Sequence, residues 1–221
     1  VQASFVKQRQ QLDEELRTQE NIQRGLAMKQ QDRGKKEEEL RRQAYQAGVE
    51  LADCQNRLHM LREMERDYEG FSKSVKLVMQ QKDRGMLRGI HGPVSQVISV
   101  PSRYVTAVET VLGGALSNII VDNRERGKDA IAYLKRVDGG RATFLPVDAI
   151  QPAVLHEKGL QSEDGFLGIA SQVVTCGREY ENIVSNLLGR TVITEDLNGA
   201  VRLSKKYGGR FRIVTLDGQL M

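Results

Sequence analysis

Apolar residues recur every seven positions over the first third of the chain. Of the ten positions spaced seven apart from Phe5 to Tyr68, eight are apolar, and Gln19 and Arg33 are the exceptions. Positions four residues further on contribute Leu16, Ala44, Leu51 and Leu58. This alternation of four and three residues predicts a coiled-coil helix of about 65 residues, which needs a partner helix along its length. A charged, disordered segment is the alternative interpretation.

The rest of the chain contains an internal repeat. When the sequence is shifted by 76 residues from Gly92, eight of 22 positions are identical, up to the alignment of Leu112-Gly113 with Leu188-Gly189. Chance would give about one or two identities. A shift of 69 then aligns GGRATFLPVD with GGRFRIVTLDG near the end of the chain. One structural unit is therefore present in two copies.

Each copy predicts a strand, a helix, a strand, a helix and a strand. The first copy reads QVISV, YVTAVETVLG, NIIVD, RGKDAIAYLKR and ATFLPV, and the second reads QVVTC, YENIVSNLLG, TVITE, LNGAVRLSKKY and RIVTL. The glycine after the first helix of each copy is placed to cap it. We therefore expect a mixed α+β domain of two lobes with pseudo-twofold symmetry, preceded by a long coiled-coil helix.

Composition changes where the heptads meet the repeat. Residues 1–70 hold 13 Lys and Arg, 14 Asp and Glu and no Pro, whereas the later residues hold all four Pro and 17 of the 21 Gly. The expected organisation is a coiled-coil arm at 1–72, a first lobe at 73–150, a linker at 151–165 and a C-terminally incomplete second lobe at 166–221. The opening VQASFVKQRQQ has no apolar core, and no run approaches the roughly 18 apolar residues of a membrane span. We expect a soluble, intracellular protein.

Catalytic and cofactor-binding motifs are not recognisable. The sequence contains neither a P-loop nor a dinucleotide-binding G-x-G-x-x-G after a strand. Cys54 and Cys176 match no metal or redox spacing and are expected to be reduced thiols. His59, His91 and His156 are isolated, although His91 lies in a tight GIHGP turn. We expect no enzymatic activity, no cofactor and no metal.

Positive charge gathers just after the predicted coiled coil. This junction cluster consists of Lys73, Lys76, Lys82, Arg84 and Arg88. Only Asp83 opposes it between residues 71 and 88. Such clusters bind phosphate backbones without reading sequence, and a solvated helix face is the alternative. A second, weaker cluster consists of Lys205, Lys206, Arg210 and Arg212.

The motifs of the repeated part closely resemble those of the hinge domain of bacterial structural maintenance of chromosomes (SMC) proteins. They are KDRGMLRGIHGPVSQVISVP, LGGALSNIIVD, AIAYLK, GGRATFLP, FLGIA, NLLGRTVITEDL and RFRIVTLDG. The resemblance runs from residue 75 to 218, and residues 1–72 share only the heptad character of the adjoining coiled coil.

The resemblance implies a hinge homodimer within a chromosome condensation and segregation ATPase, whose ATP-binding heads are not in this sequence. It also implies that an antiparallel partner helix for the coiled coil is missing from this chain, and that Gly218 begins a glycine motif at the dimer interface. The interface residues expected are Gly113, Gly114, Ala115, Leu116, Arg212, Val214, Leu216 and Gly218. The junction cluster is expected to contact double- or single-stranded DNA weakly and non-specifically, in a cytoplasmic, nucleoid-associated protein.

Two other functions stay open. One is a ligand-binding or enzymatic α/β domain on a coiled-coil stalk, in which the paired Gly-Gly-Arg turns would cradle an anion. A pocket with convergent polar groups would favour it. The other is a protein that mainly binds nucleic acid.

Overall fold

The computed structural model describes the backbone of residues 2–221 and the side chains of Arg9 and of residues 11–221. These residues form two compact units that divide after Arg66. Within the described part, the first unit is a single helix and the second unit holds all the strands. No helix in the described part of the chain is both long and apolar enough to cross a membrane.

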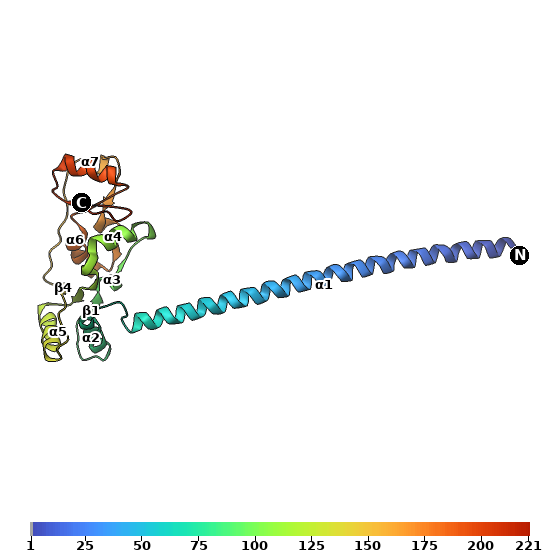
Figure 1. Cartoon of the computed structure of the whole chain (residues 1–221), viewed down its shortest axis with the longest axis horizontal. Helices are drawn as coiled ribbons and strands as arrows, with labels where there is room; N and C mark the ends of the chain where they lie inside the picture. Colours follow the sequence, from blue (N-terminus) through green and yellow to red (C-terminus); the bar gives the residue numbers. More distant parts are fainter. Residues whose placement is uncertain (1) are drawn as a thin grey trace. The chain divides into compact units, whose positions relative to one another are not determined.

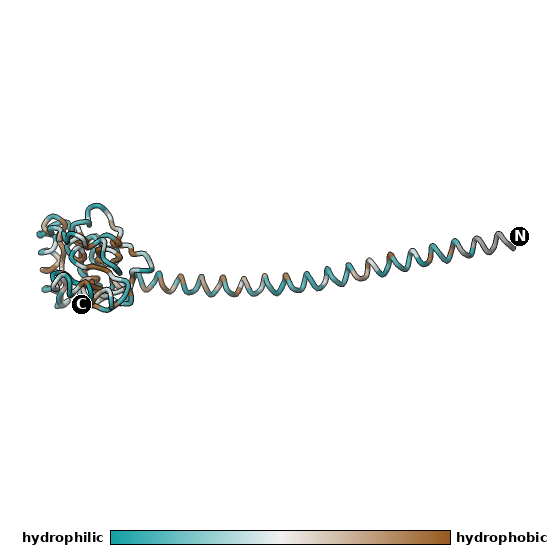
Figure 2. The backbone as a smooth tube through the Cα atoms, turned by 90° about the horizontal axis from the view of Figure 1, so that it is seen from above, coloured by the Kyte–Doolittle hydropathy of each residue, from teal (hydrophilic) through white to brown (hydrophobic). Residues whose placement is uncertain are grey.

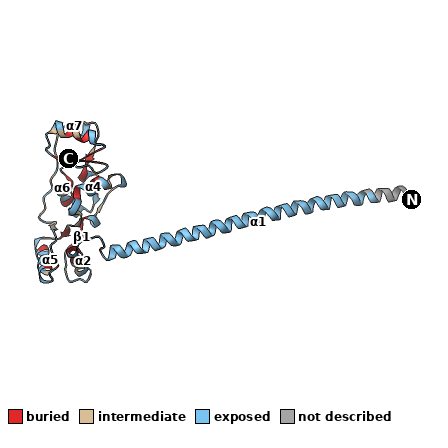
Figure 3. Cartoon of the chain, in the orientation of Figure 1, coloured by how far each residue is buried: buried red, intermediate tan, exposed pale blue. Residues whose placement is uncertain are grey.

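Helix α1 (Gln2–Arg66) runs for 65 residues without a break (Figure 1). Its apolar residues lie in solvent, with Leu12 and Leu26 each 61% exposed, and Figure 3 shows the described side chains as exposed throughout. Apolar positions recur along the helix between hydrophilic ones (Figure 2). An isolated helix with such exposure is marginally stable, so the predicted long helix is confirmed and its partner helix stays a prediction. The side chain of Phe5 lies outside the described side chains.

The first lobe contains one three-stranded sheet and the helices around it. In chain order its elements are α2 (Lys73–Asp83), β1 (Ile90–Pro93), α3 (Val94–Val97), β2 (Ile98–Ser99), η1 (Ser102–Tyr104), α4 (Val105–Leu112), η2 (Gly113–Ser117), β3 (Ile119–Val121), α5 (Arg124–Arg136) and β4 (Phe144–Pro146). The strand order is β1-β3-β4, with β1 antiparallel and β4 parallel to β3. Helix α5 makes the crossover, and it begins at Asn123, whose side chain accepts a hydrogen bond from the Arg126 N–H.

The second lobe repeats this arrangement. Its elements are η3 (Leu160–Ser162), β5 (Phe166–Ile169), η4 (Ala170–Gln172), β6 (Thr175–Cys176), η5 (Arg178–Tyr180), α6 (Glu181–Leu188), β7 (Thr191–Thr194), α7 (Leu197–Tyr207) and β8 (Arg212–Thr215). The strand order β5-β7-β8 has the same strand directions as the first sheet. Both sheets carry an irregularity at equivalent glycines, Gly92 with φ +152° and Gly168 with φ +157°. The predicted duplication is therefore confirmed.

One part of the predicted strand order is wrong. QVISV and QVVTC were expected to be the first strand of each copy, but β1 and β5 precede them and form the three-stranded sheets with the two later strands. The two runs instead supply β2 and β6, which pair with each other through Ile98 opposite Cys176 and Ser99 opposite Thr175. A run of five residues does not reveal its partner, and Gly92-Pro93 is typical of a turn rather than of a strand with a bulge.

The two lobes share a hydrophobic core. Helix α4 of the first lobe and helix α6 of the second lie in the middle of this unit in Figure 1, with α2 and α5 at one end and α7 at the other. The shared core includes Val108 and Ile120 from the first lobe and Val184 and Ile193 from the second. Each fully buried side chain of this size contributes about 1.5–3 kcal/mol through burial. The shared core therefore holds both lobes together as one body.

The linker also belongs to this body, because it packs on the second lobe. The Leu155 N–H donates to the Gly189 carbonyl oxygen at 2.9 Å, and Leu160 is only 2% exposed beneath α7. The polar segment between the copies is thus anchored by apolar side chains within it.

Candidate interaction surfaces

The predicted interface glycines 113 and 114 form an exposed tip after α4. Gly113 adopts φ +46°, which L side chains rarely adopt, and a methyl group at either glycine would meet nothing within 4 Å. The next two residues of η2, Ala115 and Leu116, are half-buried against the shared core. The tip therefore presents mainly backbone and small side chains to solvent.

Gly218 lies against α4, close to the helix that leads into this tip. Its φ is +87°, and an added methyl carbon would lie 2.8 Å from Thr110 Oγ1 and 3.1 Å from Thr106 Cγ2. Leu216, two residues earlier, is half-buried against the shared core. The structure thus gathers six predicted interface residues around α4, namely 113–116, 216 and 218.

The other two predicted interface residues lie elsewhere. Val214 is 0% exposed inside the shared core, so its side chain is not on the surface of the monomer. Arg212 is exposed at the opposite end of β8, where its guanidinium donates to the Leu187 carbonyl oxygen at 3.0 Å.

The outer edge of β8 is covered by the chain's own backbone. Ile213 and Met221 exchange two hydrogen bonds of 2.9 and 2.8 Å, and the Thr215 N–H donates to the Gln219 carbonyl oxygen at 3.0 Å. In the described residues no strand pairs with the outer edge of the equivalent β4. The outer edge of the sheet is therefore open in the first lobe, within the described residues, and covered in the second.

The junction cluster lies on α2 and the residues that follow it. Val75, Val78 and Met79 bury one face of α2, while three cations of the cluster (Lys73, Arg84 and Arg88) are exposed and Lys76 is half-exposed. Lys82 differs from the others, because its Nζ donates to the His91 carbonyl oxygen at 2.8 Å. Lys82 therefore has a structural partner within the first lobe.

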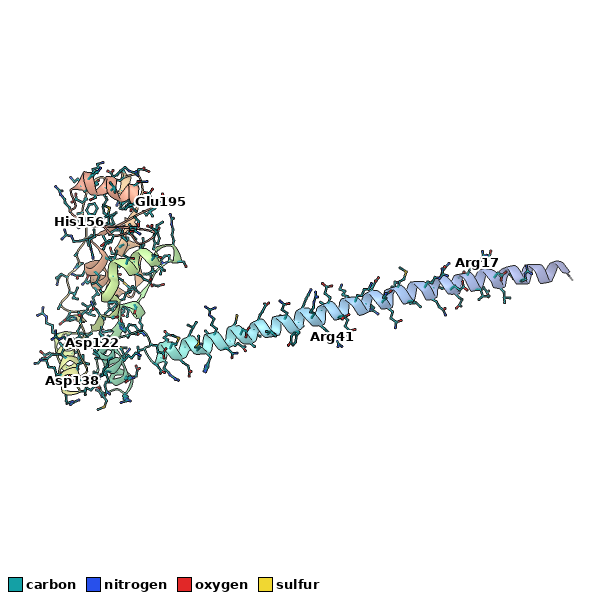
Figure 4. All side chains as sticks on the ribbon, viewed as in Figure 1. Arg17, Arg41, Asp122, Asp138, His156 and Glu195 are labelled. Atoms are coloured by element: carbon teal, nitrogen blue, oxygen red, sulfur yellow. The ribbon has the colours of Figure 1, made fainter. Side chains whose placement is uncertain are left out.

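His91 joins the two lobes. Its Nε2 lies 2.8 Å from Asp122 Oδ1, and its Nδ1 lies 2.9 Å from the Tyr180 hydroxyl of the second lobe, with the two rings edge to face. A carboxylate only accepts, so the neutral ring carries its proton on Nε2 and accepts from Tyr180 at Nδ1. Burial, followed by the charge of Glu179, raises the pKa of Tyr180 and keeps this hydroxyl protonated. His156, in the linker, lies far from Asp122 in Figure 4.

The second predicted cationic cluster is partly neutralised by the linker. Lys206 and the Tyr207 hydroxyl both bond to the Glu163 carboxylate, and Arg210 lies 3.7 Å from Glu157. Chiefly because Lys206 donates to it, the pKa of Glu163 is lowered from its usual value. Arg202 and Asp164 form a further pair at 2.9 Å. These partners lie about 40 positions away in sequence, which is why sequence analysis missed them.

No group of three or more His, Cys, Asp or Glu side chains in the described residues is arranged to hold a metal ion.

Comparison with known proteins agrees with this architecture. The family model for the SMC proteins Flexible Hinge Domain matches residues 87–204. The chromosome partition protein Smc of Bacillus subtilis (strain 168) is 36% identical over 213 residues, which are 95% of this chain and 18% of that protein. The corresponding protein of Halothermothrix orenii is 41% identical over 166 residues, covering 74% of this chain and 14% of that protein. The chain thus spans less than a fifth of either relative.

Solved structures show the same fold. An asymmetric dimer of the Geobacillus stearothermophilus SMC hinge domain matches with a TM-score of 0.76 and 42% identity, over 80% of this chain and 71% of that chain. The Pyrococcus furiosus SMC hinge domain matches with a TM-score of 0.56 and 29% identity, over 72% of this chain and 79% of that chain. The duplicated lobes, the long helix and these matches together show that the chain belongs to the SMC flexible hinge domain family.

Proposed function

We propose that this chain is the hinge that joins two copies of a chromosome-partitioning SMC protein. The observation that carries the proposal is the exposed tip formed by Gly113 and Gly114, which directly follow α4. Small residues let two backbones approach closely, so this tip is suited to packing against the same surface of a second copy. The related hinge domain of G. stearothermophilus forms an asymmetric dimer in its crystal structure, which supports the same role here.

The proposed interface consists of the residues gathered around α4. They are Gly113, Gly114, Ala115, Leu116, Leu216 and Gly218. Val214 lies in the core beneath this surface, and Arg212 lies outside it, at the opposite end of β8. Gly218 keeps the segment after β8 close to α4, because any side chain at this position would meet Thr110.

Sedimentation equilibrium of Gly114→Asp tests this interface. Gly114 has open space around it and no left-handed φ, so the substitution leaves the fold intact. A carboxylate forced into a desolvated interface is expected to raise the dimer dissociation constant about tenfold or more. Gly48→Asp on α1, where a side chain also meets nothing, is the matched control. A wild-type chain that stays monomeric at about 100 micromolar, which corresponds to an association free energy weaker than about −5.5 kcal/mol, would refute the proposal.

We further propose that the junction cluster contacts DNA weakly and without sequence preference. Lys73, Lys76, Arg84 and Arg88 supply the contact, while Lys82 holds the His91 backbone. Each neutralised phosphate is expected to contribute about 0.9 to the slope of log affinity against log salt.

Fluorescence anisotropy with a short duplex and a single strand tests the DNA contact. Lys73→Glu/Lys76→Glu is expected to weaken binding about tenfold at low salt and to flatten the salt slope. Lys158→Glu/Lys205→Glu reverses the same charge at exposed positions of the linker and the second lobe and serves as the control. Equal losses in both variants would show that net charge, and not this cluster, determines binding.

The whole protein, in this proposal, is a nucleoid-associated ATPase of chromosome condensation and segregation. This chain covers 18% of the B. subtilis relative, and the ATP-binding heads and the antiparallel partner of α1 are proposed to lie in the remainder of such a protein. The exposed apolar positions of α1 support such a partner helix.

A further inference from the structure

A hollow in the second lobe is lined by three arginines. It has a volume of about 470 Å³ and lies where β7 and β8 begin, next to the end of α7. Its polar lining includes Arg190, Arg210, Arg212, Ser204 and Asn186, and none of its lining residues is Asp or Glu. Its one aromatic residue, Phe211, is buried at 8% exposure, so no ring is available to stack on a base. The hollow thus offers charge and hydrogen-bond donors.

Backbone carbonyl groups hold two of these guanidinium groups in place. Arg190 donates to the Arg210 carbonyl oxygen at 3.4 Å, and Arg212 donates to the Leu187 carbonyl oxygen at 3.0 Å. Because Thr191 and Arg212 are partners in the parallel strand pair, the two arginines start from neighbouring strands. A guanidinium has five N–H donors, so most of them stay available for a ligand.

Charge compensation around the hollow is incomplete. On the adjoining helix, Arg202 and Lys206 each have a carboxylate partner in the linker. Of the three arginines, Arg210 is 3.7 Å from Glu157, and its side chain is 70% exposed. An exposed pair at this distance contributes little. Met221, the last residue of the sequence, also lines the hollow and adds its terminal carboxylate. The three arginines still outnumber this group and Glu157, so the hollow carries an excess of positive charge that an anion would balance.

The first lobe provides an internal comparison. At the positions of Ser204, Arg210 and Arg212, it has Lys135, Arg141 and Thr143. Instead of the short Gly189-Arg190 connection, it has η2, whose sequence GGALS holds no cation. Both lobes fold alike, so the set of three arginines is not a requirement of the fold.

We propose that this hollow binds a phosphate group. The three arginines would bind its oxygens, because a planar guanidinium matches phosphate geometry in a bidentate manner. Ser204 and Asn186 would be neutral donors, the latter through its second N–H, since its amide nitrogen already donates to the Gln151 carbonyl oxygen at 2.8 Å. The phosphate belongs either to a nucleic-acid backbone or to a free polyphosphate. The site is in the second lobe and is independent of the junction cluster in the first.

Calorimetric titration of the chain with inorganic pyrophosphate at constant ionic strength tests the site. Arg190→Gln/Arg212→Gln is expected to weaken binding about tenfold or more. Lys158→Gln/Lys205→Gln removes the same charge outside the hollow and is expected to change binding less than about twofold. Failure of the wild-type chain to bind pyrophosphate, or equal losses in both variants, would overturn the proposal.

A further double variant keeps the proposal testable if the glutamine variant fails to fold. Arg190→Lys/Arg212→Lys keeps the charge and removes the bidentate fork, so an intermediate loss of affinity is expected. Full affinity in this variant, together with unfolding of the glutamine variant, would overturn the proposal.

A short duplex tested in parallel identifies the source of the phosphate. If the glutamine variant loses affinity for both ligands, the phosphate belongs to a nucleic-acid backbone. If it loses affinity for pyrophosphate alone, the ligand is a free polyphosphate. If the glutamine variant weakens only dimerisation, the arginines bind a second copy and the phosphate proposal is wrong.

Discussion

The two lobes have the same topology but differ where they meet their surroundings. After α4, the first lobe carries η2, in which Gly113 and Gly114 are exposed. After α6, the second lobe has the buried Gly189 and the exposed Arg190. The outer edge of β4 is open among the described residues, whereas β8 is covered by residues 219–221. The repeat thus specifies the architecture, while the proposed functions lie in the positions at which the copies have diverged.

The contact between the lobes diverges in the same way. His91 of β1 bonds to Tyr180 in the second lobe. At the equivalent positions of the other copy stand Leu167 and Tyr104, both packed on the shared core. One side of the pseudo-twofold contact is therefore polar and the other is apolar.

The largest expected effect on the free energy of unfolding comes from Gly189, which follows α6, and the equivalent Gly113, which follows α4, provides the comparison. An added methyl group at Gly189 would collide with the backbone carbonyl oxygens of Ala153 and Ser185, whereas one at Gly113 would meet nothing. Gly189→Ala is expected to lower the free energy of unfolding by about 3 kcal/mol, because backbone must move. Gly113→Ala should lower it by only about 1 kcal/mol, through its left-handed φ. Urea unfolding followed by tyrosine fluorescence measures both, and equal losses would contradict the comparison.

A smaller effect is expected at the polar contact between the lobes. Tyr180→Phe removes the hydrogen bond to His91 and should lower the free energy of unfolding by about 1 kcal/mol. Tyr104→Phe, at the equivalent position, should change it by less than about 0.5 kcal/mol. In the double variant with His91→Leu, the loss from Tyr180→Phe should largely disappear, since the two residues are coupled. Additive losses would show that the two side chains act independently.

The smallest expected effect is the pH dependence of the stability that Glu163 contributes, by which the linker is held on the second lobe. The pKa of Glu163 is lowered, so the folded state favours the charged carboxylate. The resulting stabilisation is present above the usual value of 4.5 and is lost as pH falls through the lower pKa of the folded state. An NMR titration of the Glu163 carboxyl group should show this lowered pKa, and Lys206→Gln should return it towards 4.5. A lowered pKa that persists in Lys206→Gln would assign the shift to another group.

Local patterns predicted much of the fold. The heptads predicted α1, and the repeat predicted α4 and α5 in the first lobe, α6 and α7 in the second, and the two later strands of each lobe. β1 and β5 were missed because GIHGP and FLGIA contain glycines that are typical of turns, and here these glycines occupy sheet irregularities. β2 and β6 have two residues each and depend on each other across the lobes, so neither run specifies its partner.

The interaction surfaces were less predictable, because they depend on residues far apart in sequence. Val214 was expected at an interface, but helices cover both faces of this sheet, so alternation along β8 leaves no exposed face there. Tyr180 lies 89 positions from His91, so the histidine was singled out without its partner. Charge counting likewise could not separate Lys82, which bonds to a carbonyl oxygen, from the exposed cations beside it.

Hydrogen–deuterium exchange above and below the dimer dissociation constant tests the central claim most directly. If the surface around α4 joins two copies, amides of residues 113–117 and 216–218 should gain protection as concentration rises. Amides of the linker, which contacts its own lobe, should not change. Protection confined to the linker or to α5, with none at residues 113–117, would contradict the proposed interface.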